Sequence, residues 1–233
     1  MQFSLFQIAA AGLAPKLSTD SLVHHIVAMQ RKEGDWPNYG TVRPPLEDGG
    51  FSHTAKGIRV LRVYPMPARK AEFDERVERA AKWLEAAEPR TTEDRSMQLL
   101  GIAWAGHKAP PQRIRQLVAE QRANGGWGQT PELPADAYAT GEALWAIHES
   151  GVSSSDPAFL RGVDFLLRTQ GEAGDWHVVT RALGFQPYFQ SGFPHEHDQW
   201  ISEAGTAMAA IALTFAEHPG PSKSARAQVG SLR

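Results

Sequence analysis

One stretch of this chain places two histidines and two carboxylates within four residues. Residues 195–198 read His-Glu-His-Asp, between the pair Phe193-Pro194 and Trp200. Imidazole and carboxylate groups at this density can converge on a divalent metal or share a proton. The alternative is a surface loop in which Asp198 caps the next helix and the histidines pack on aromatic rings, and it carries more weight. We therefore assign no metal and expect Asp198 as a candidate acid beside three substrate-binding residues: His195, His197 and Trp200.

A second candidate acid, Asp136, stands at the start of a mostly apolar helix in the sequence Asp-Ala-Tyr-Ala-Thr-Gly. Its carboxylate could act as an acid or anchor a ligand, with Tyr138 as a binding residue. It could equally be the N-cap of the helix, a position that favours aspartate. His53, which follows Glu47 and Asp48, is a weaker candidate of the same kind.

Helical patterns must position these residues. We predict helices over 1–13, 17–29, 51–63, 72–87, 91–105, 112–121, 136–150, 157–169 and 201–215. Nearly all-apolar helices alternate with amphipathic ones at a period of about forty to fifty residues, in the range of repeat architectures. An all-apolar helix cannot lie at the surface, so we expect about five inner helices and four outer ones, with no strands. The predicted class is all-α.

Three of the outer helices end in the same way. A glutamine stands at or just after the end of each helix and a tryptophan lies six residues later, with a glycine one or two residues before it: Gln30 and Trp36, Gln121 and Trp127, Gln170 and Trp176. A glutamine side chain can bond the open backbone at a helix end, glycine allows the chain to reverse, and tryptophan can pack across the junction. We assign this Gln-Gly-Trp turn to stability.

The turn and the alternating helices resemble the QW repeats of the terpenoid cyclase and protein prenyltransferase superfamily, and squalene-hopene cyclases in particular. The resemblance covers about 22–215 and implies an α/α toroid, in which inner helices surround a cavity. The helix over 72–87 departs from the pattern, because Glu88 replaces the glutamine and no Gly-x-Trp follows. We therefore expect a short or incomplete toroid.

The catalytic groups of the resembled families are missing. The chain contains no Asp-x-Asp-Asp, the acid motif of class II cyclases. It also has no cysteine for the usual zinc site of the prenyltransferases. In those enzymes the segment that matches the one beginning at Asp136 contributes to the zinc site. In a toroid the inner helices would begin near one mouth of the cavity. Their starts carry acidic residues that either cap helices or form a polar ring around a ligand: Glu47, Asp48, Glu93, Asp94, Asp136, Glu196 and Asp198.

Composition sets further bounds. The chain has 233 residues, a formal charge of -2 and no dense basic run, which argues against a nucleic-acid partner. We identify no membrane-spanning run, and the apolar N-terminus lacks the basic residues of a secretory signal. We expect a soluble protein and favour the cytoplasm. A single domain is predicted over 1–217, followed by a disordered tail over 218–233.

Two functions follow from these observations. The first is a cyclase-like domain that binds an isoprenoid or another apolar small molecule in a central cavity and isomerises or cyclises it, without a cofactor. Aromatic residues near the inner helices suit such a guest, although aromatics at helical spacing more often form core. The second is a non-catalytic helical interaction or structural module, part of a longer chain, which would self-associate if the ring is open.

Overall fold

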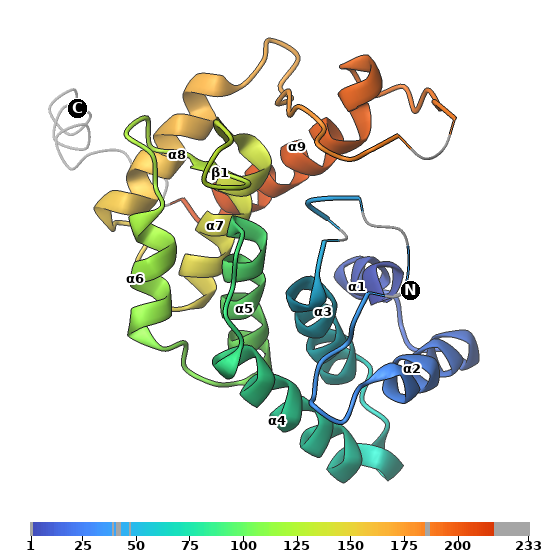
Figure 1. The fold of residues 1–233 in the computed structure, drawn as a ribbon. Helices are drawn as coiled ribbons and strands as arrows, with labels where there is room; N and C mark the ends of the chain where they lie inside the picture. Colours follow the sequence, from blue (N-terminus) through green and yellow to red (C-terminus); the bar gives the residue numbers. More distant parts are fainter. Residues whose placement is uncertain (1, 39, 41–42, 47, 185–186, 217–233) are drawn as a thin grey trace, which may run out of the picture.

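The computed structural model describes residues 2–38, 40, 43–46, 48–184 and 187–216, and over these the chain is mostly helical (Figure 1). The predicted tail lies outside the described residues. The helices are α1 (Gln2–Ala10), α2 (Leu17–Met29), α3 (Gly50–Val63), α4 (Lys70–Ala86), α5 (Thr92–Ala105), α6 (Pro111–Ala119), α7 (Ala137–Glu149), α8 (Pro157–Thr169) and α9 (Gln199–Thr214). Short 3-10 helices cover Pro67–Arg69 and Glu196–Asp198.

The prediction of no strands is wrong. Two short strands, β1 (Trp127–Gly128) and β2 (Ala135–Asp136), pair antiparallel with Trp127 opposite Asp136. They bracket the loop that leads into α7. The pairing brings the tryptophan of the second Gln-Gly-Trp turn to the start of α7, and so fixes where that helix begins.

The helices form two rows. In the inner row α3, α5, α7 and α9 pack each against the next, and α1 packs on α3. The outer helices α4, α6 and α8 each pack against the two inner helices that they connect, and α2 packs on α1 and α3. The row curves in Figure 1, with the outer helices on its convex side. This arrangement agrees with the predicted alternation of apolar and amphipathic helices.

Each Gln-Gly-Trp turn has the same internal bonds. The indole Nε1 of its tryptophan donates to a carbonyl of the outer helix that has just ended, at 2.7–2.8 Å in all three turns. The glutamine Nε2 donates to the carbonyl of the glycine four residues later. In the second turn Gly125 has φ +93°, and a methyl group there would collide with the Arg161 carbonyl. The turn therefore favours glycine on two grounds.

The tryptophans also hold the inner row. Their backbone N–H groups donate to threonine hydroxyls of the next inner helix: Trp36 to Thr54, Trp127 to Thr140, and Trp176 to Thr206. Two of the glutamines reach across to the next outer helix, since Gln30 bonds the Arg76 carbonyl and Gln121 that of Ala158. Each turn therefore connects the outer row of helices to the inner row.

The irregular end of α4 is held differently. Gln98, buried on the inner helix α5, donates to the carbonyls of Leu84 and Ala87 at that end. Glu88, which replaces the glutamine of the other turns, forms an ion pair with Arg113 of α6 at 2.9 Å. The Gln-Gly-Trp sequence is absent here, but other side chains bond the open backbone groups at the end of α4.

The first helix fills space at the C-terminal ends of the inner row. The ring of Phe6 lies 5.7 Å from that of Trp104 and 6.3 Å from that of Trp145, and the two tryptophans lie 5.6 Å apart. Leu5 is fully buried. The residues of α1 thus pack against three inner helices, and the N-terminal ends of α3, α5, α7 and α9 form the more open end of the row.

The predicted helices over 91–105 and 157–169 begin within one residue of the observed α5 and α8. Thr91 and Asp94 form a reciprocal capping box on α5, and Asp156 caps α8 with Pro157 in its first turn.

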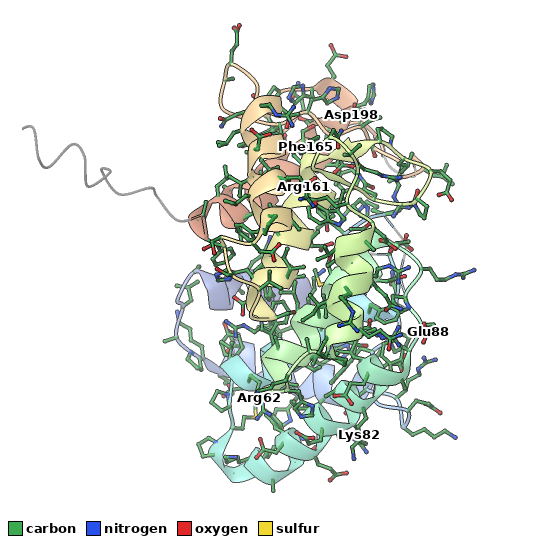
Figure 2. All side chains as sticks on the ribbon, turned by 90° about the vertical axis from the view of Figure 1, so that its left-hand side faces the viewer. Arg62, Lys82, Glu88, Arg161, Phe165 and Asp198 are labelled. Carbon is green, nitrogen blue, oxygen red and sulfur yellow. The ribbon has the colours of Figure 1, made fainter. Side chains whose placement is uncertain are left out.

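In the side view of Figure 2, Asp198 lies toward one end of the molecule and Lys82 toward the other. No helix among the described residues has the length and apolar character to cross a membrane.

We predict that Gln121→Ala lowers the free energy of unfolding by about 2 kcal/mol, because it removes two hydrogen bonds to part-buried carbonyls, of about 1 kcal/mol each, while the exposed bonds that Arg161 donates to the Gln121 side chain add little. Gln170→Ala is the matched control, because Gln170 bonds only within its own turn and should cost about half as much. Urea unfolding followed by circular dichroism measures both. Equal losses in the two variants would contradict a role for Gln121 in joining α6 to α8.

Candidate functional site

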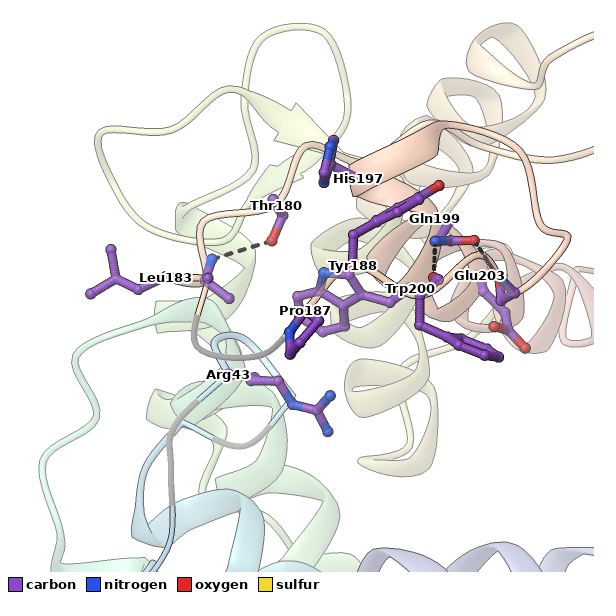
Figure 3. Close-up of a pocket in the computed structure, with 13 residues that line it drawn as sticks. Arg43, Thr180, Leu183, Pro187, Tyr188, His197, Gln199, Trp200 and Glu203 are labelled. Carbon is purple, nitrogen blue, oxygen red and sulfur yellow. Dashed lines mark hydrogen bonds between the residues drawn. The ribbon is translucent and has the colours of Figure 1, made fainter.

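A cleft of about 450 Å³ opens between the start of α9 and the loop that precedes it (Figure 3). Its apolar wall consists of Leu183, Pro187, Tyr188, Phe189 and Trp200. Its polar groups are Arg43, Thr180, Ser191, His197, Gln199 and Glu203. Tyr188 and Phe189 are exposed, and Trp200 is partly buried. A partly enclosed aromatic surface with a few polar groups is typical of a small-molecule site.

Three side chains hold the loop over the cleft. Asp198 accepts from the Thr180 backbone N–H at 2.8 Å, while the buried Gln199 bonds the Phe189 carbonyl and the backbone N–H of Ser191. Arg181 fixes the middle of the segment through hydrogen bonds to Gln129 and Asp48. The wall of the cleft is therefore attached at both of its ends to residues at the start of α9.

The histidines of the His-Glu-His-Asp stretch do not converge. His195 pairs with Asp175, His177 pairs with Asp198 at 2.8 Å, and the two imidazoles stack with centroids 4.4 Å apart. His197 turns instead toward the Tyr188 ring, 4.5 Å away. Among the residues that the structure describes, no group of three or more His, Asp or Glu side chains could hold a metal ion.

Arg181 joins the starts of two inner helices. Its guanidinium donates to Gln129 at 2.8 Å and to Asp48 at 3.2 Å, just before α3. Gln129 in turn donates to Asp136 at 2.9 Å. Asp136 is the N-cap of α7, since its other oxygen accepts from the Ala139 backbone N–H. Burial is the main cause that raises its pKa to about 6, against hydrogen bonds and the Arg181 charge, which lower it.

Beneath this network lies a buried carboxyl cluster, formed by Glu93 of α5, Tyr138 and Glu142 of α7, and Lys56 of α3. Tyr138 donates to Glu93 at 2.7 Å, and the two carboxyl groups lie close enough for each to shift the pKa of the other. Burial raises the pKa of both glutamates, and their mutual repulsion raises that of Glu142 further. The Lys56 ammonium opposes the rise at Glu93. With a proton on Glu142, the negative charge of Glu93 and the positive charge of Lys56 leave the cluster neutral.

The structure brings together only part of the predicted site. His197 and Trp200 line the cleft, with Asp198 and His195 behind the loop. Tyr138 was expected to contact substrate, but it is fully buried and bonds Glu93. His53 is partly buried and contacts the Gly49 carbonyl on its own helix, away from the cleft-lining set. Of the acidic helix starts, Asp48 and Asp136 meet through Arg181, and Glu47 lies outside the described residues.

Four residues of the cleft, the Arg181 network and the buried cluster were not singled out from the sequence. Arg43 and Arg181 stand in irregular loops, where no periodic pattern draws attention to them. Glu142 and Lys56 did carry a signal, because each is a charged residue on the apolar stretch of an inner helix. A charge at such a position must find a partner inside the fold.

Comparison with known proteins gives one short match. The chain is 42% identical over 64 residues to the enfumafungin synthase efuA of Hormonema carpetanum. This segment is 28% of the chain and 5% of that synthase, so the chain spans a small part of the length of the relative. No protein-family model matches the chain. The match links a short segment of the chain to a synthase.

The buried carboxyls predict a pH dependence of stability. The folded chain holds a proton on Glu142 that the unfolded chain releases once the pH exceeds the ordinary value of 4.5, so stability falls as the pH rises above that value. Between pH 6.5 and 8 we expect Glu142→Gln to lose about 1–2 kcal/mol less than the native chain, at about 1.4 kcal/mol per pH unit for one proton.

Urea unfolding at both pH values measures this difference. Glu149→Gln is the matched control, because Glu149 is exposed on the same helix. An equal decline in the native chain and in Glu142→Gln would show that Glu142 does not hold the proton.

Proposed function

We propose that this chain is a terpenoid-cyclase-like domain, a short α/α toroid that binds an apolar small molecule such as an isoprenoid. The observation that carries the proposal is the cleft of about 450 Å³ with its wall of tyrosine, phenylalanine and tryptophan. Burying an apolar guest on that wall is favourable by about 25 cal/mol for each Å² removed from water. The binding place is the mouth of the inner row, because α1 fills the far end.

Two further observations support the same proposal. The Gln-Gly-Trp turns join an inner and an outer row of helices, as the resemblance to QW repeats implies. The short match is to a protein named as an enfumafungin synthase. Neither observation identifies the substrate of this chain. We propose its apolar character from the lining of the cleft alone.

If the bound molecule is transformed, the candidate acids are Asp136 and Asp198. Each accepts two hydrogen bonds, Asp198 from His177 and Thr180, and Asp136 from Gln129 and Ala139. Asp136, with a pKa of about 6, holds a proton part of the time near neutral pH. It is the better candidate. Product analysis after incubation with squalene, with native chain and Asp136→Asn, tests this role, and a native chain that forms no product removes it.

We predict that the native chain binds farnesol, and that Tyr188→Ala and Phe189→Ala each weaken binding about tenfold, the equivalent of a loss of about 1.4 kcal/mol of apolar contact. Isothermal titration calorimetry measures the affinity. Leu167→Ala is the matched control, since Leu167 is an exposed apolar residue on α8, outside the cleft. A native chain without affinity for farnesol, or an equal loss in the control, would contradict the proposal.

A second candidate is a helical interaction module that associates with another copy of itself. It is favoured by α8, where Leu160 and Leu167 are 53% and 58% exposed and lie two turns apart on one face. The third Gln-Gly-Trp turn, which follows α8, ends the outer row of helices. A methyl group placed on its Gly174 would have only the Gln170 side chain within 4 Å, at 3.9 Å. The outer face of α8 thus presents apolar surface that a second copy could cover.

This candidate predicts a dimer that Leu160→Ser with Leu167→Ser dissociates, because both changes make the contact face polar. Sedimentation velocity at several concentrations measures the association. Leu183→Ser is the control, since Leu183 is exposed elsewhere, on the cleft loop. A monomer at all concentrations would exclude the module as a self-associating one.

A further inference from the structure

We propose that Asn124, in the second Gln-Gly-Trp turn, is a site of spontaneous covalent modification: its side-chain amide is lost with its neighbour Gly125 as the nucleophile, and the isoaspartate product disrupts the turn. The site lies between α6 and α7, outside the cleft, and is independent of any ligand bound there. It is indicated by the residue that follows Asn124, by the hydrogen bond of the Asn124 side chain, and by the backbone bonds around it.

The fold requires a glycine directly after Asn124. Gly125 has φ +93°, and a methyl group there would lie 2.4 Å from the Arg161 carbonyl oxygen. The backbone nitrogen of a glycine is open to close approach, because no side chain shields it. Asn124 itself is exposed, so water can reach its amide and ammonia can leave. The turn therefore keeps an asparagine amide next to an unshielded backbone nitrogen.

The reaction needs water and no other reactant. The Gly125 nitrogen gives up its proton and bonds to Cγ of Asn124, the bond from Cγ to the side-chain nitrogen breaks, and that nitrogen leaves as ammonia. Water then opens the succinimide ring at either carbonyl, with its hydroxyl on the carbonyl carbon and its hydrogen on the ring nitrogen. The product is aspartate or isoaspartate at position 124, and no atom is oxidised or reduced.

The side chain of Asn124 is held in a way that favours this attack. Its Oδ1 accepts from the Gly126 backbone N–H at 3.1 Å. Negative charge develops on that oxygen when a nitrogen adds to Cγ, and an N–H group aimed at it stabilises the charge. The Gly125 N–H donates to the Arg122 carbonyl at 2.9 Å, so this bond must open before the nitrogen attacks. The turn thus activates the amide and sets the rate by its own opening.

Isoaspartate would disrupt the turn, because it adds one main-chain atom between residues 124 and 125. The Arg122 N–H donates to the Gly126 carbonyl across this point at 2.8 Å, and the Arg168 guanidinium donates to the Asn124 carbonyl at 3.0 Å. A longer main chain cannot keep both bonds at these lengths without shifting Trp127, which follows at once and is fully buried.

Aspartate, by contrast, leaves the main chain unchanged. The position three residues after the glutamine is Glu33 in the first turn and Ala173 in the third. The turn therefore forms with a carboxylate or with a methyl group at this position, and it does not depend on the amide of Asn124. Only the isoaspartate product is expected to alter the fold.

Peptide mapping by mass spectrometry, during incubation of the native chain in mildly alkaline buffer, tests the reaction. Asn38, the other asparagine of the chain, is the internal control: its Oδ1 also accepts from the backbone N–H two residues later, that of Gly40 at 2.8 Å, but a tyrosine follows it instead of a glycine. We expect Asn124 to lose its amide at least about ten times faster than Asn38. Equal rates, or a faster loss at Asn38, would overturn the inference.

Two variants complete the test. Asn124→Ala takes the residue of the third turn and should fold, and its release of ammonia should fall to the rate of Asn38; release equal to that of the native chain would place the reaction elsewhere. Asn124→Asp carries the charge of the product on an unaltered main chain. The isoaspartate form, isolated by chromatography, should unfold at a lower urea concentration than Asn124→Asp, and equal midpoints would show that the turn tolerates the longer main chain.

Discussion

The fold depends on one repeated set of hydrogen bonds, those of the tryptophan in each Gln-Gly-Trp turn. The indole N–H bonds the outer helix that has just ended, and the backbone N–H bonds a threonine of the inner helix that follows. Both donors are buried, so each must find a partner inside the fold. The two bonds fix the distance between the rows, and the inner helices therefore begin at one common end.

That common end explains why polar chemistry gathers there. Asp48 precedes α3 and Asp136 caps α7, and Arg181 lies between them although it is 133 residues from Asp48 in the chain. Below them, a protonated Glu142 keeps the buried cluster neutral, which avoids an uncompensated charge in the interior. Above them, the loop that carries Arg181 forms one wall of the cleft. The Gln-Gly-Trp turns, the buried carboxyl cluster and the candidate cleft thus all lie toward the N-terminal ends of the inner helices.

The sequence predicted much of this fold and less of the site. The bounds of α2 were predicted to the residue, because Pro15 and the apolar pattern delimit it and such signals are local. The caps formed by Thr91 and Asp156 are likewise local contacts. The two short strands, the replacement of a glutamine by Gln98 and the placement of Phe6 between two tryptophans depend on contacts between distant segments, which no period in the sequence encodes.

The candidate site shows the same division. Trp200 and His197 were found because aromatic and imidazole groups stand close together in the sequence. Arg43 joins them from a loop more than 150 residues away in the chain, and only the fold brings it over the Trp200 ring. Tyr138 was placed in the wrong environment, since a tyrosine after a helix cap looks the same in sequence whether it faces a ligand or a buried glutamate.

The central claim is that an apolar ligand binds at the mouth of the inner row, and hydrogen-exchange mass spectrometry with farnesol tests it most directly. The account predicts slower exchange of backbone amides in 187–203, with α1 and the C-terminal ends of α5 and α7 unchanged. Protection of α1 and those helix ends, without any in 187–203, would contradict it, because the ligand would then lie where Phe6 packs.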